Sequence, residues 1–267
     1  MDQDTAEPPR NAEAGIAAVR HIILVLSGKG GVGKSTVAVN LAAGLRDAGK
    51  QVGLLDLDLH GPSLPTMLGL AAAEPQSDGE RILPVLSDGI AVMSIGFLLE
   101  SPASAVVWRG SRKAEAIQQF LDDVAWGPLD HLVIDLPPGT GDEVLAVAQA
   151  LPQADGAVIV AAPQAVANAD VRRSITFCQH LDLPILGLIE NMRGFVCPDC
   201  GTVTDIFGSG GGEQLATELE LPFLGSIPID RAVASSGDGG RPYVHPGQDS
   251  ETARRFRAAI ATLLADG

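Results

Sequence analysis

Lysine is scarce in this chain, and positive charge is outnumbered throughout. The 267 residues include 18 lysines and arginines against 33 aspartates and glutamates, which gives a formal net charge of −15. Lysine occurs four times, at positions 29, 34, 50 and 113. Proteins that bind nucleic acid or an anionic membrane surface need clustered basic side chains to neutralise phosphate. The composition therefore argues against nucleic acid and against a membrane as partners.

Long hydrophobic runs are also lacking. No apolar stretch approaches the roughly 18 residues that a membrane-spanning helix requires. The segment Met1–Arg20 is acidic and rich in Ala and Pro, without the basic and then apolar regions of a signal peptide. We predict a cytoplasmic protein in which residues 1–20 are disordered or loosely packed.

Cysteine occurs three times, and this odd count argues against a disulfide framework in a cytosolic chain of this size. Cys178 lies in a helical pattern and is expected to pack in the core. Cys197-Pro198-Asp199-Cys200 is a C-x-x-C motif, which suits half a zinc ribbon, a redox pair or two ligands of an iron–sulfur cluster. The redox alternative is the weakest, because no thioredoxin-like βαβ unit begins there. A four-coordinate site needs four ligands, which two copies across a two-fold axis would supply.

What the sequence does contain is a regular alternation of strand-like and helix-like segments from His21 onwards. Several strands are nearly continuous in Val, Ile, Leu and Ala, as expected when helices cover both faces of a parallel sheet. Such alternation is typical of an α/β fold with a doubly wound, mostly parallel sheet, whose ligands bind at the carboxyl ends of the strands. We see no repeat or linker, and predict a single domain over residues 21–267.

The expected strands are His21–Ser27, Gln51–Asp56, Ile90–Ile95, His131–Leu136, Gly156–Ala161, Ile185–Glu190 and Phe223–Ser226. The expected helices are Lys34–Ala48, Ser111–Val124, Asp142–Leu151, Val166–Leu181, Gly212–Leu219 and Glu251–Ala265. Two segments rich in turn residues complete the pattern. Leu70–Gly89 is expected to be a surface excursion with a short hairpin, and Ser235–Gly247 a loop.

The strongest motif is a glycine-rich loop between the first expected strand and the first expected helix. Its spacing fits G-x-x-x-x-G-K-[ST], the phosphate-binding P-loop. The glycines let backbone N–H groups turn towards one anion, and the helix N-terminus adds its dipole. Lys34 is expected to reach the β- and γ-phosphates, and the Ser35 hydroxyl to bind Mg²⁺. The residues of this nucleotide-binding loop are Gly28, Lys29, Gly30, Gly31, Val32, Gly33, Lys34, Ser35 and Thr36.

Carboxylates follow two of the expected strands, as a P-loop requires for holding Mg²⁺ and the attacking water. The apolar run 132–134 ends in Asp135, which is the Walker B pattern, and Asp135 is expected to hold Mg²⁺ through a water molecule. Gly139 can offer its N–H to the γ-phosphate and move when that phosphate leaves. Asp56 and Asp58 follow the second expected strand.

The loop resembles the deviant P-loop, K-G-G-x-G-K-[ST], of the MinD/ParA class of nucleotide-dependent dimerising ATPases. In that class the extra lysine, here Lys29, crosses the dimer interface and touches the partner's nucleotide. The resemblance also implies that Asp58 positions or activates the attacking water, that Asp56 helps to orient the Mg²⁺ shell, and that Asn191 reads adenine. An Asn amide can donate and accept together, which suits the adenine edge.

Taken together, the motifs resemble those of the Mrp/ApbC-like ATPases, which are iron–sulfur cluster carriers. That resemblance implies a homodimer that binds ATP and a labile [4Fe–4S] cluster, held by Cys197 and Cys200 of both chains, and that passes the cluster to apo-proteins. It implies slow hydrolysis, since Arg109 is only a weak candidate for a stimulating arginine, and it allows Zn²⁺ to replace the cluster in air. It also places Pro228, Ile229 and Asp230 at the nucleotide site. The motifs occur in this order after the P-loop: Asp58-Leu59-His60-Gly61-Pro62-Ser63, Trp108-Arg109-Gly110, Asp135-Leu136-Pro137-Pro138-Gly139-Thr140-Gly141-Asp142, Asn191-Met192, Cys197-Pro198-Asp199-Cys200, Phe207-Gly208 with Gly210-Gly211-Gly212, and Pro228-Ile229-Asp230.

Two alternatives stay open. A positioning ATPase of the MinD/ParA kind shares the nucleotide site but needs a basic face or a basic amphipathic tail. The tail from Glu251 carries three arginines and then ends acidic and rich in Ala, which makes a poor membrane anchor. A zinc-bridged dimer without cluster transfer would use the same cysteines, because Cys-Pro-x-Cys-Gly is typical of half a zinc ribbon.

Overall fold

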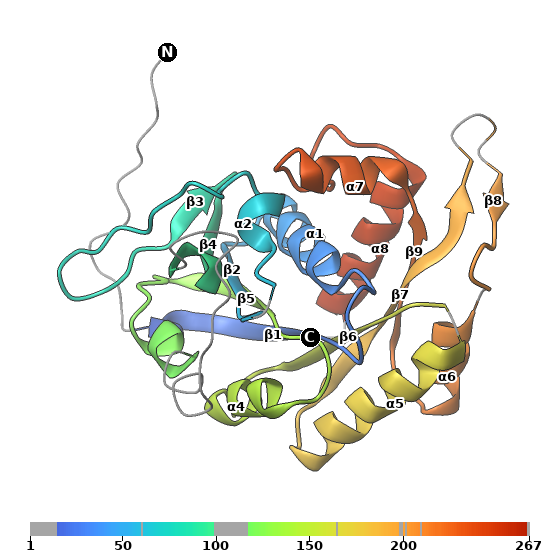
Figure 1. Ribbon diagram of the computed structural model, residues 1–267, viewed down its shortest axis with the longest axis horizontal. Helices are drawn as coiled ribbons and strands as arrows, with labels where there is room; N and C mark the ends of the chain where they lie inside the picture. Colours follow the sequence, from blue (N-terminus) through green and yellow to red (C-terminus); the bar gives the residue numbers. More distant parts are fainter. Residues whose placement is uncertain are drawn as a thin grey trace.

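One sheet runs through the molecule, and its strands are mostly parallel (Figure 1). The computed structural model describes residues 15–59, 61–98, 117–163, 165–197, 200, 202–208 and 210–265. Within them the strands are β1 (Val19–Ser27), β2 (Val52–Asp56), β3 (Val85–Ser87), β4 (Ile90–Ser94), β5 (Leu129–Asp135), β6 (Gly156–Ala161), β7 (Ile185–Val196), β8 (Val203–Thr204) and β9 (Phe223–Ile229). They form one sheet in the order β3-β4-β2-β5-β1-β6-β7-β8, and β9 also pairs with β7.

The direction of the strands confirms the expected fold class. Neighbours from β4 across to β7, and β7 with β9, pair in parallel, whereas β3 and β8 pair antiparallel with β4 and β7. The strands β2, β4 and β6 are buried along their whole length, because helices cover both faces. The carboxyl ends of the parallel strands therefore meet at one edge of the sheet, where ligands bind in such folds.

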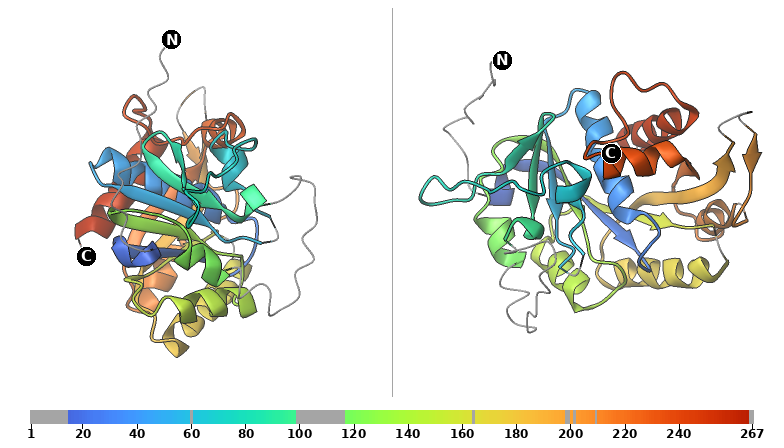
Figure 2. Two further views of the ribbon diagram at one scale, coloured as in Figure 1. Left: turned by 90° about the vertical axis from the view of Figure 1, so that its left-hand side faces the viewer. Right: turned by 45° about the horizontal axis from the view of Figure 1, so that its top comes forward.

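Helices form a layer on each face of the sheet (Figure 1; Figure 2). One layer holds α1, α2, α7 and α8, and the other holds α4, α5 and α6, together with helical residues at 117–122. The bounds are α1 (Lys34–Asp47), α2 (Leu64–Met67), α4 (Asp142–Ala150), α5 (Ala165–His180), α6 (Gly211–Glu218), α7 (Arg231–Asp238) and α8 (Glu251–Ala265), with 3-10 helices at Gly15–Ala18 and Ile95–Leu98. Among the helices of the described residues, none is long and apolar enough to cross a bilayer.

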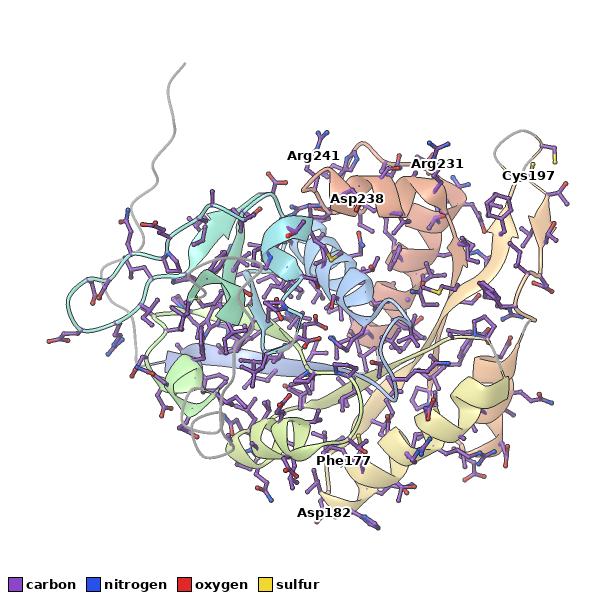
Figure 3. All side chains as sticks on the ribbon, in the orientation of Figure 1. Phe177, Asp182, Cys197, Arg231, Asp238 and Arg241 are labelled. Carbon is purple, nitrogen blue, oxygen red and sulfur yellow. The ribbon has the colours of Figure 1, made fainter. Side chains whose placement is uncertain are left out.

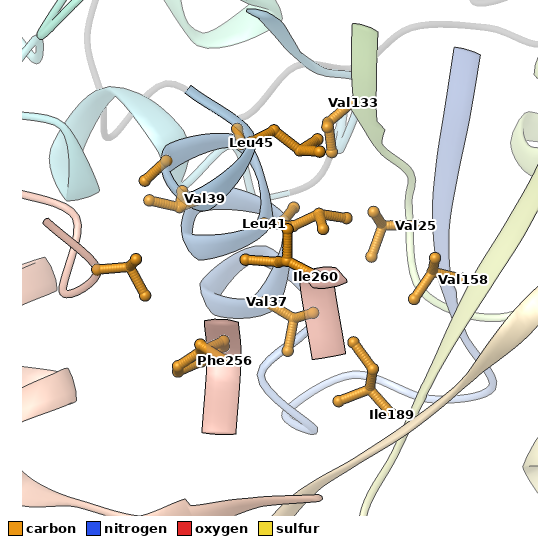
Figure 4. Packing of buried hydrophobic residues seen from close by; sticks show 14 of the residues in the cluster. Val25, Val37, Val39, Leu41, Leu45, Val133, Val158, Ile189, Phe256 and Ile260 are labelled. Carbon is orange, nitrogen blue, oxygen red and sulfur yellow. The ribbon is translucent and has the colours of Figure 1, made fainter. Parts of the chain in front are cut away.

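The helix α1 packs between the sheet and α8 in one apolar core (Figure 4). Val37 and Leu41 of α1 belong to one buried cluster with Val25 of β1, Ile189 of β7 and Ile260 of α8. Each fully buried aliphatic side chain of this kind contributes about 1.5–3 kcal/mol. This packing fixes the first turn of α1, and hence the glycine-rich loop before it, against the ends of β1 and β7.

Several boundaries differ from those expected. Residues 15–20 were expected to be loosely packed, but they are ordered. Gly15 is buried, Ile16 packs against an apolar cluster that includes Ile22 and Phe120, and β1 begins at Val19. The expected loop from Ser235 is wrong at its start, since α7 runs to Asp238. The Asp230 side chain caps α7 by accepting from Ala232 N, and a cap of this kind outweighs weak local helix propensity.

Two further differences concern strand ends. β7 continues past Glu190 to Val196 and β9 past Ser226 to Ile229, because each finds a pairing partner beyond the end expected from its apolar run. The expected surface hairpin is confirmed by an antiparallel bridge between Ser77 and Ile82. Of the expected features, residues 1–14, His60, Trp108-Arg109-Gly110, the helix start at 111–116, Pro198 and Asp199 lie outside the described residues.

Candidate functional site

The glycine-rich loop joins the end of β1 to the start of α1 at the carboxyl edge of the sheet. Gly31 and Gly33 have φ values of +79° and +81°, a region that L side chains rarely adopt. The helix α1 begins without a side-chain cap, so its first N–H groups and its dipole are available to an anion. A pocket of about 290 Å³ lies here, and its lining includes Gly30, Lys34, Ser35, Thr36, Asp58 and Pro138.

Lys34 and Asp135 form a buried ion pair at the floor of this pocket. Lys34 Nζ lies 2.5 Å from Asp135 Oδ1, and the two side chains are 6% and 1% exposed. Burial raises the pKa of Asp135, and the Lys34 ammonium opposes that shift. The structure thus brings together the P-loop lysine and the Walker B aspartate, which lie 101 residues apart in the sequence.

The second oxygen of Asp135 is the best indication of a cation. Among the described residues Asp135 Oδ2 is buried and has no hydrogen-bond partner, although buried carboxylate oxygens are nearly always paired. Ser35 lies close to this carboxylate, because an interaction with the Ser35 side chain is among those that lower the pKa of Asp135, and Ser35 Oγ is 3.4 Å from Lys34 Nζ. A carboxylate oxygen next to a hydroxyl and a site for phosphate is the donor set that Mg²⁺ prefers, so the residues fit this ion.

Asp56 is bound differently from what was expected of a residue in the Mg²⁺ shell. Its Oδ1 accepts from Asp58 N at 3.0 Å, and its Oδ2 accepts from Ser94 Oγ at 3.0 Å and from Leu64 N at 3.3 Å. Burial, together with the charge of neighbouring Asp135, raises the pKa of Asp56 to about 7. Asp56 therefore anchors the loop between β2 and α2 and also interacts directly with the charge of Asp135.

Asp58 follows β2 and lines the same pocket, and Gly139 follows β5, directly after the lining residue Pro138. Asp58 is half-buried, lines the pocket and accepts from Gly61 N at 3.2 Å. The Gly139 N–H, which was expected to face the γ-phosphate, donates to Ser27 O at 2.8 Å. Gly139 has φ +90° and a Cβ there would meet nothing within 4 Å, so the peptide has room to turn. It would have to exchange this partner to reach a phosphate.

Asn191 lies under the P-loop. Its Nδ2 donates to Val32 O at 2.8 Å, and a Cβ added to Gly33 would come within 2.2 Å of that nitrogen. The amide therefore ties the middle of β7 to the loop.

The Asp230 carboxylate is hydrogen-bonded to residues of the C-terminal part of the fold. Its Oδ1 accepts from Ala232 N, and its Oδ2 accepts from the hydroxyls of Tyr243 at 3.0 Å and Thr252 at 2.8 Å. A nucleotide contact from the stretch 228–230 would thus come from its backbone or from Pro228 and Ile229.

The two cysteines of the C-x-x-C motif lie at the tip of the hairpin formed by β7 and β8, away from the body of the molecule (Figure 3). Cys197 N donates to Thr202 O at 2.9 Å, and Cys200 Sγ lies 3.2 Å from Thr202 Oγ1. Hydrogen bonds to Cys200 from the Thr202 side chain, from the Thr202 backbone and from Cys197, in that order of size, lower the pKa of the exposed Cys200 thiol. Both thiols are free, so the pair can present thiolates to a metal centre outside the chain's own core.

Comparison with known proteins decides the family. The model of the NUBPL iron-transfer P-loop NTPases, a ParA-type family, matches residues 18–264. The chain belongs to this family. It is 51% identical over 250 residues to the iron–sulfur cluster carrier protein of Methanocaldococcus jannaschii, covering 93% of this chain and 86% of the relative. It is also 52% identical over 239 residues to the human cytosolic Fe-S cluster assembly factor NUBP2, covering 87% and 88% of the two chains.

Solved structures agree with this assignment. A nucleotide-binding protein from Archaeoglobus fulgidus in complex with ADP superposes with a TM-score of 0.76 at 43% identity, covering 85% of this chain and 88% of that one. The cell division ATPase MinD of Pyrococcus furiosus superposes with a TM-score of 0.67 at 24% identity, covering 92% and 98%, and supports the fold alone. The resemblance to iron–sulfur carrier ATPases of the MinD/ParA class is thereby confirmed.

Two further features of the fold differ in how far they follow from the sequence. Cys178 is buried in the core as expected, and burial raises the pKa of its thiol to about 11. In contrast, the role of the buried Glu190 and of Arg193, which lie on either side of Asn191 in β7, does not follow from the sequence. The available signal is a charged residue after an apolar run, and such a residue indicates the end of a strand.

Proposed function

We propose that this chain is an ATP-binding and slowly hydrolysing carrier that holds a [4Fe–4S] cluster between two copies of itself and delivers it to apo-proteins. The observation that carries the proposal is the placement of two free thiols, Cys197 and Cys200, directly after β7, the strand whose Asn191 contacts the P-loop. The family membership supplies the class of cargo, and the pocket at the P-loop supplies the site for nucleotide.

In the nucleotide site we assign each residue one task. Residues Gly28 to Gly33 and Thr36 bind the phosphates through backbone N–H groups, and Lys34 binds the β- and γ-oxygens after leaving Asp135. Ser35 and Asp135 hold Mg²⁺, which when bound neutralises charge on the phosphates. Asp58 orients the water that attacks the γ-phosphorus, while Asp56 fixes the loop that carries Asp58. Lys29 reaches the nucleotide of the second copy.

The remaining assignments concern adenine and the released phosphate. Asn191 offers its amide oxygen to the adenine amino group, and Pro228, Ile229 and the backbone of Asp230 close the base site. Gly139 turns its N–H from Ser27 towards the γ-phosphate and returns when that phosphate leaves. Such an exchange of hydrogen-bond partners is a common way for an NTPase to report hydrolysis.

The cluster is cargo, and its ligands determine the assembly. Each chain offers Cys197 and Cys200, and a [4Fe–4S] cluster takes four thiolates, so two chains related by a two-fold axis complete the site. The lowered pKa of Cys200 favours the thiolate that binds iron. Because the thiols are at an exposed hairpin tip, an acceptor's own cysteines can approach and replace them one at a time. We place this work in the cytosol, as the name of the human relative says of that protein.

The proposal is tested by reconstitution without oxygen, followed by measurement of iron, sulfide and zinc per dimer and of transfer to an apo-ferredoxin. We expect about four irons and four sulfides per dimer, lost in the Cys197→Ala/Cys200→Ala variant. The matched control is Cys178→Ala, which removes the buried thiol and leaves the iron content unchanged. One zinc and no iron under these conditions would instead establish the zinc-bridged dimer.

A further inference from the structure

A single strand links the nucleotide loop to the cysteines. Asn191 of β7 donates to Val32 O of the P-loop at 2.8 Å, and Cys197 follows six positions later in the chain. A Cβ at Gly33 would overlap with Asn191 Nδ2, so the loop and the strand are packed with no space between them. A displacement of the P-loop therefore reaches β7 directly.

The strand bends between these two points. Met192 and Gly194 have φ values of +63° and +69°, and the pairing of β7 with β9 shifts register between Asn191 and Phe195. A Cβ at Gly194 would lie 2.7 Å from Val203 Cγ1 of β8. The residues 192–194 thus form the root of the cysteine hairpin, where it leaves the regular sheet.

Arg193 lies in the middle of this bend and ties it to α6. Its Nη1 is 2.8 Å from Glu213 Oε2, and its Nε is 3.5 Å from Glu190 Oε2. Glu190 is fully buried, and its Oε1 accepts from Gly212 N at 2.8 Å in the first turn of α6. We call Glu190, Arg193 and Glu213 the hairpin-root cluster.

The charges in this cluster make its geometry demanding. Among the described residues Glu190 Oε2 has no hydrogen-bond partner, so the Arg193 guanidinium at 3.5 Å is the cation that faces it. A buried carboxylate without a compensating cation is costly, and Arg193 therefore cannot leave Glu190 freely when the strand moves. These contacts therefore couple the orientation of the β7–β8 hairpin, relative to the rest of the sheet, to the position of β7.

We propose that Arg193 is a positioning residue, which sets the angle of the cysteine hairpin against the nucleotide site and so carries the nucleotide state to Cys197 and Cys200. The proposal rests on the proposed function for its biological meaning, but its test does not require a cluster. The nucleotide moves the P-loop and Asn191, the hairpin-root cluster keeps β7 and α6 together, and the bend converts the movement into a new exposure of the thiols.

The test measures the rate at which a maleimide labels Cys197 and Cys200 in cluster-free protein, with and without Mg²⁺ and a non-hydrolysable ATP analogue. For the wild type we expect the nucleotide to change the rate by at least ~5-fold, the lower end of a typical coupling between two sites. The Arg193→Gln and Glu213→Gln variants should still bind the analogue. In both, the ratio of the labelling rates with and without nucleotide should fall to about 1. Arg193→Lys, which keeps the charge and loses the fork, should retain part of the ratio.

The matched control is Glu218→Gln, which breaks the exposed ion pair between Arg172 of α5 and Glu218 of the same α6 and should keep the full ratio. Glu213 is half-exposed, so Glu213→Gln tests the idea even where Arg193→Gln does not fold. The positioning role would be overturned if Arg193→Gln and Glu213→Gln both kept the wild-type ratio of labelling rates. It would also be overturned if the nucleotide did not change the wild-type labelling rate. Neither result would bear on how much iron the protein binds. Conversely, loss of iron binding with an intact nucleotide effect would overturn the carrier and leave Arg193 in its role.

Discussion

The Lys34 ammonium and the Asp135 carboxylate lie 2.5 Å apart in the floor of the nucleotide pocket, almost completely removed from solvent. Each charge compensates the other, and the buried Asp135 Oδ2 has no hydrogen-bond partner among the described residues. A bound triphosphate would compete with Asp135 for Lys34, while Mg²⁺ would take over the compensation of Asp135. Nucleotide and metal binding are therefore expected to depend on each other.

Replacing Asp135 by Asn should remove Mg²⁺-dependent hydrolysis. We expect a loss of roughly 100-fold in turnover, with binding of metal-free ADP retained because Lys34 is released towards the phosphates. The measurements are phosphate release and ADP affinity in EDTA. Asp130→Asn serves as the control, because Asp130 lies on the same strand and its ion pair with Arg20 is on the surface. Equal turnover in the wild type and Asp135→Asn would remove Asp135 from the site.

The stability of the metal-free protein should carry a signature of Asp56. Its pKa is raised in the folded protein from 3.8 to about 7, so between these values the folded state binds a proton that the unfolded state has lost. The contribution is fully present below pH 4 and is lost as the pH rises through 7, and it amounts to at most about 4 kcal/mol.

Urea denaturation in EDTA between pH 4 and 8 measures this effect. The wild type should lose stability relative to Asp56→Asn as the pH rises, because Asn carries no proton to lose. A difference between the two proteins that stays constant over this pH range would show that Asp56 is ionised throughout.

Gly33 and Gly31 offer a matched pair for testing the contact of β7 with the P-loop. Both have positive φ, but a Cβ at Gly33 would meet Asn191 Nδ2 at 2.2 Å, whereas a Cβ at Gly31 would meet nothing within 4 Å. Gly31→Ala should cost about 1–2 kcal/mol of backbone strain. Gly33→Ala should cost about 1–3 kcal/mol more from overpacking, and it should also weaken nucleotide binding. If thermal unfolding showed the same loss of stability for both variants, the Asn191 side chain would be able to move away from the added methyl group at no cost.

Asp230 should prove more important for stability than for catalysis. Asp230→Ala removes a helix cap and two hydrogen bonds from Tyr243 and Thr252, and we expect a loss of roughly 3 kcal/mol in urea denaturation. Tyr243→Phe removes one of these bonds and should cost about 1 kcal/mol. An Asp230→Ala protein of normal stability that cannot bind ADP would instead place the carboxylate at the nucleotide.

The local part of the nucleotide site could be predicted from sequence, because its geometry follows from consecutive residues. Glycines, Lys34 and Ser35 are fixed by one strand, one loop and one helix, and the end of β5 supplies Asp135 at the same edge of the sheet. The roles that depend on distant partners could not be predicted. The role of Asp56 depends on its hydrogen bond from Ser94, 38 positions away. The role of Asp230 depends on its hydrogen bond from Thr252, 22 positions away.

The cysteine hairpin shows the same limit. The C-x-x-C motif is evident in the sequence, but β7 was expected to end at Glu190, since a charged residue and then Arg193-Gly194 interrupt the apolar run. In the structure Glu190 is buried against Gly212 and Arg193, so the strand continues to Val196. A buried carboxylate that accepts from the first turn of α6, 22 positions later in the chain, leaves no periodic trace in the sequence.

Two chains that share one cluster have a characteristic mass. Native mass spectrometry of the protein, reconstituted without oxygen, measures it. We expect a dimer whose mass exceeds that of two chains by one [4Fe–4S] cluster, and a Cys197→Ala/Cys200→Ala variant that carries none. A cluster on a single chain, or a dimer that binds only zinc under the same conditions, would contradict this expectation.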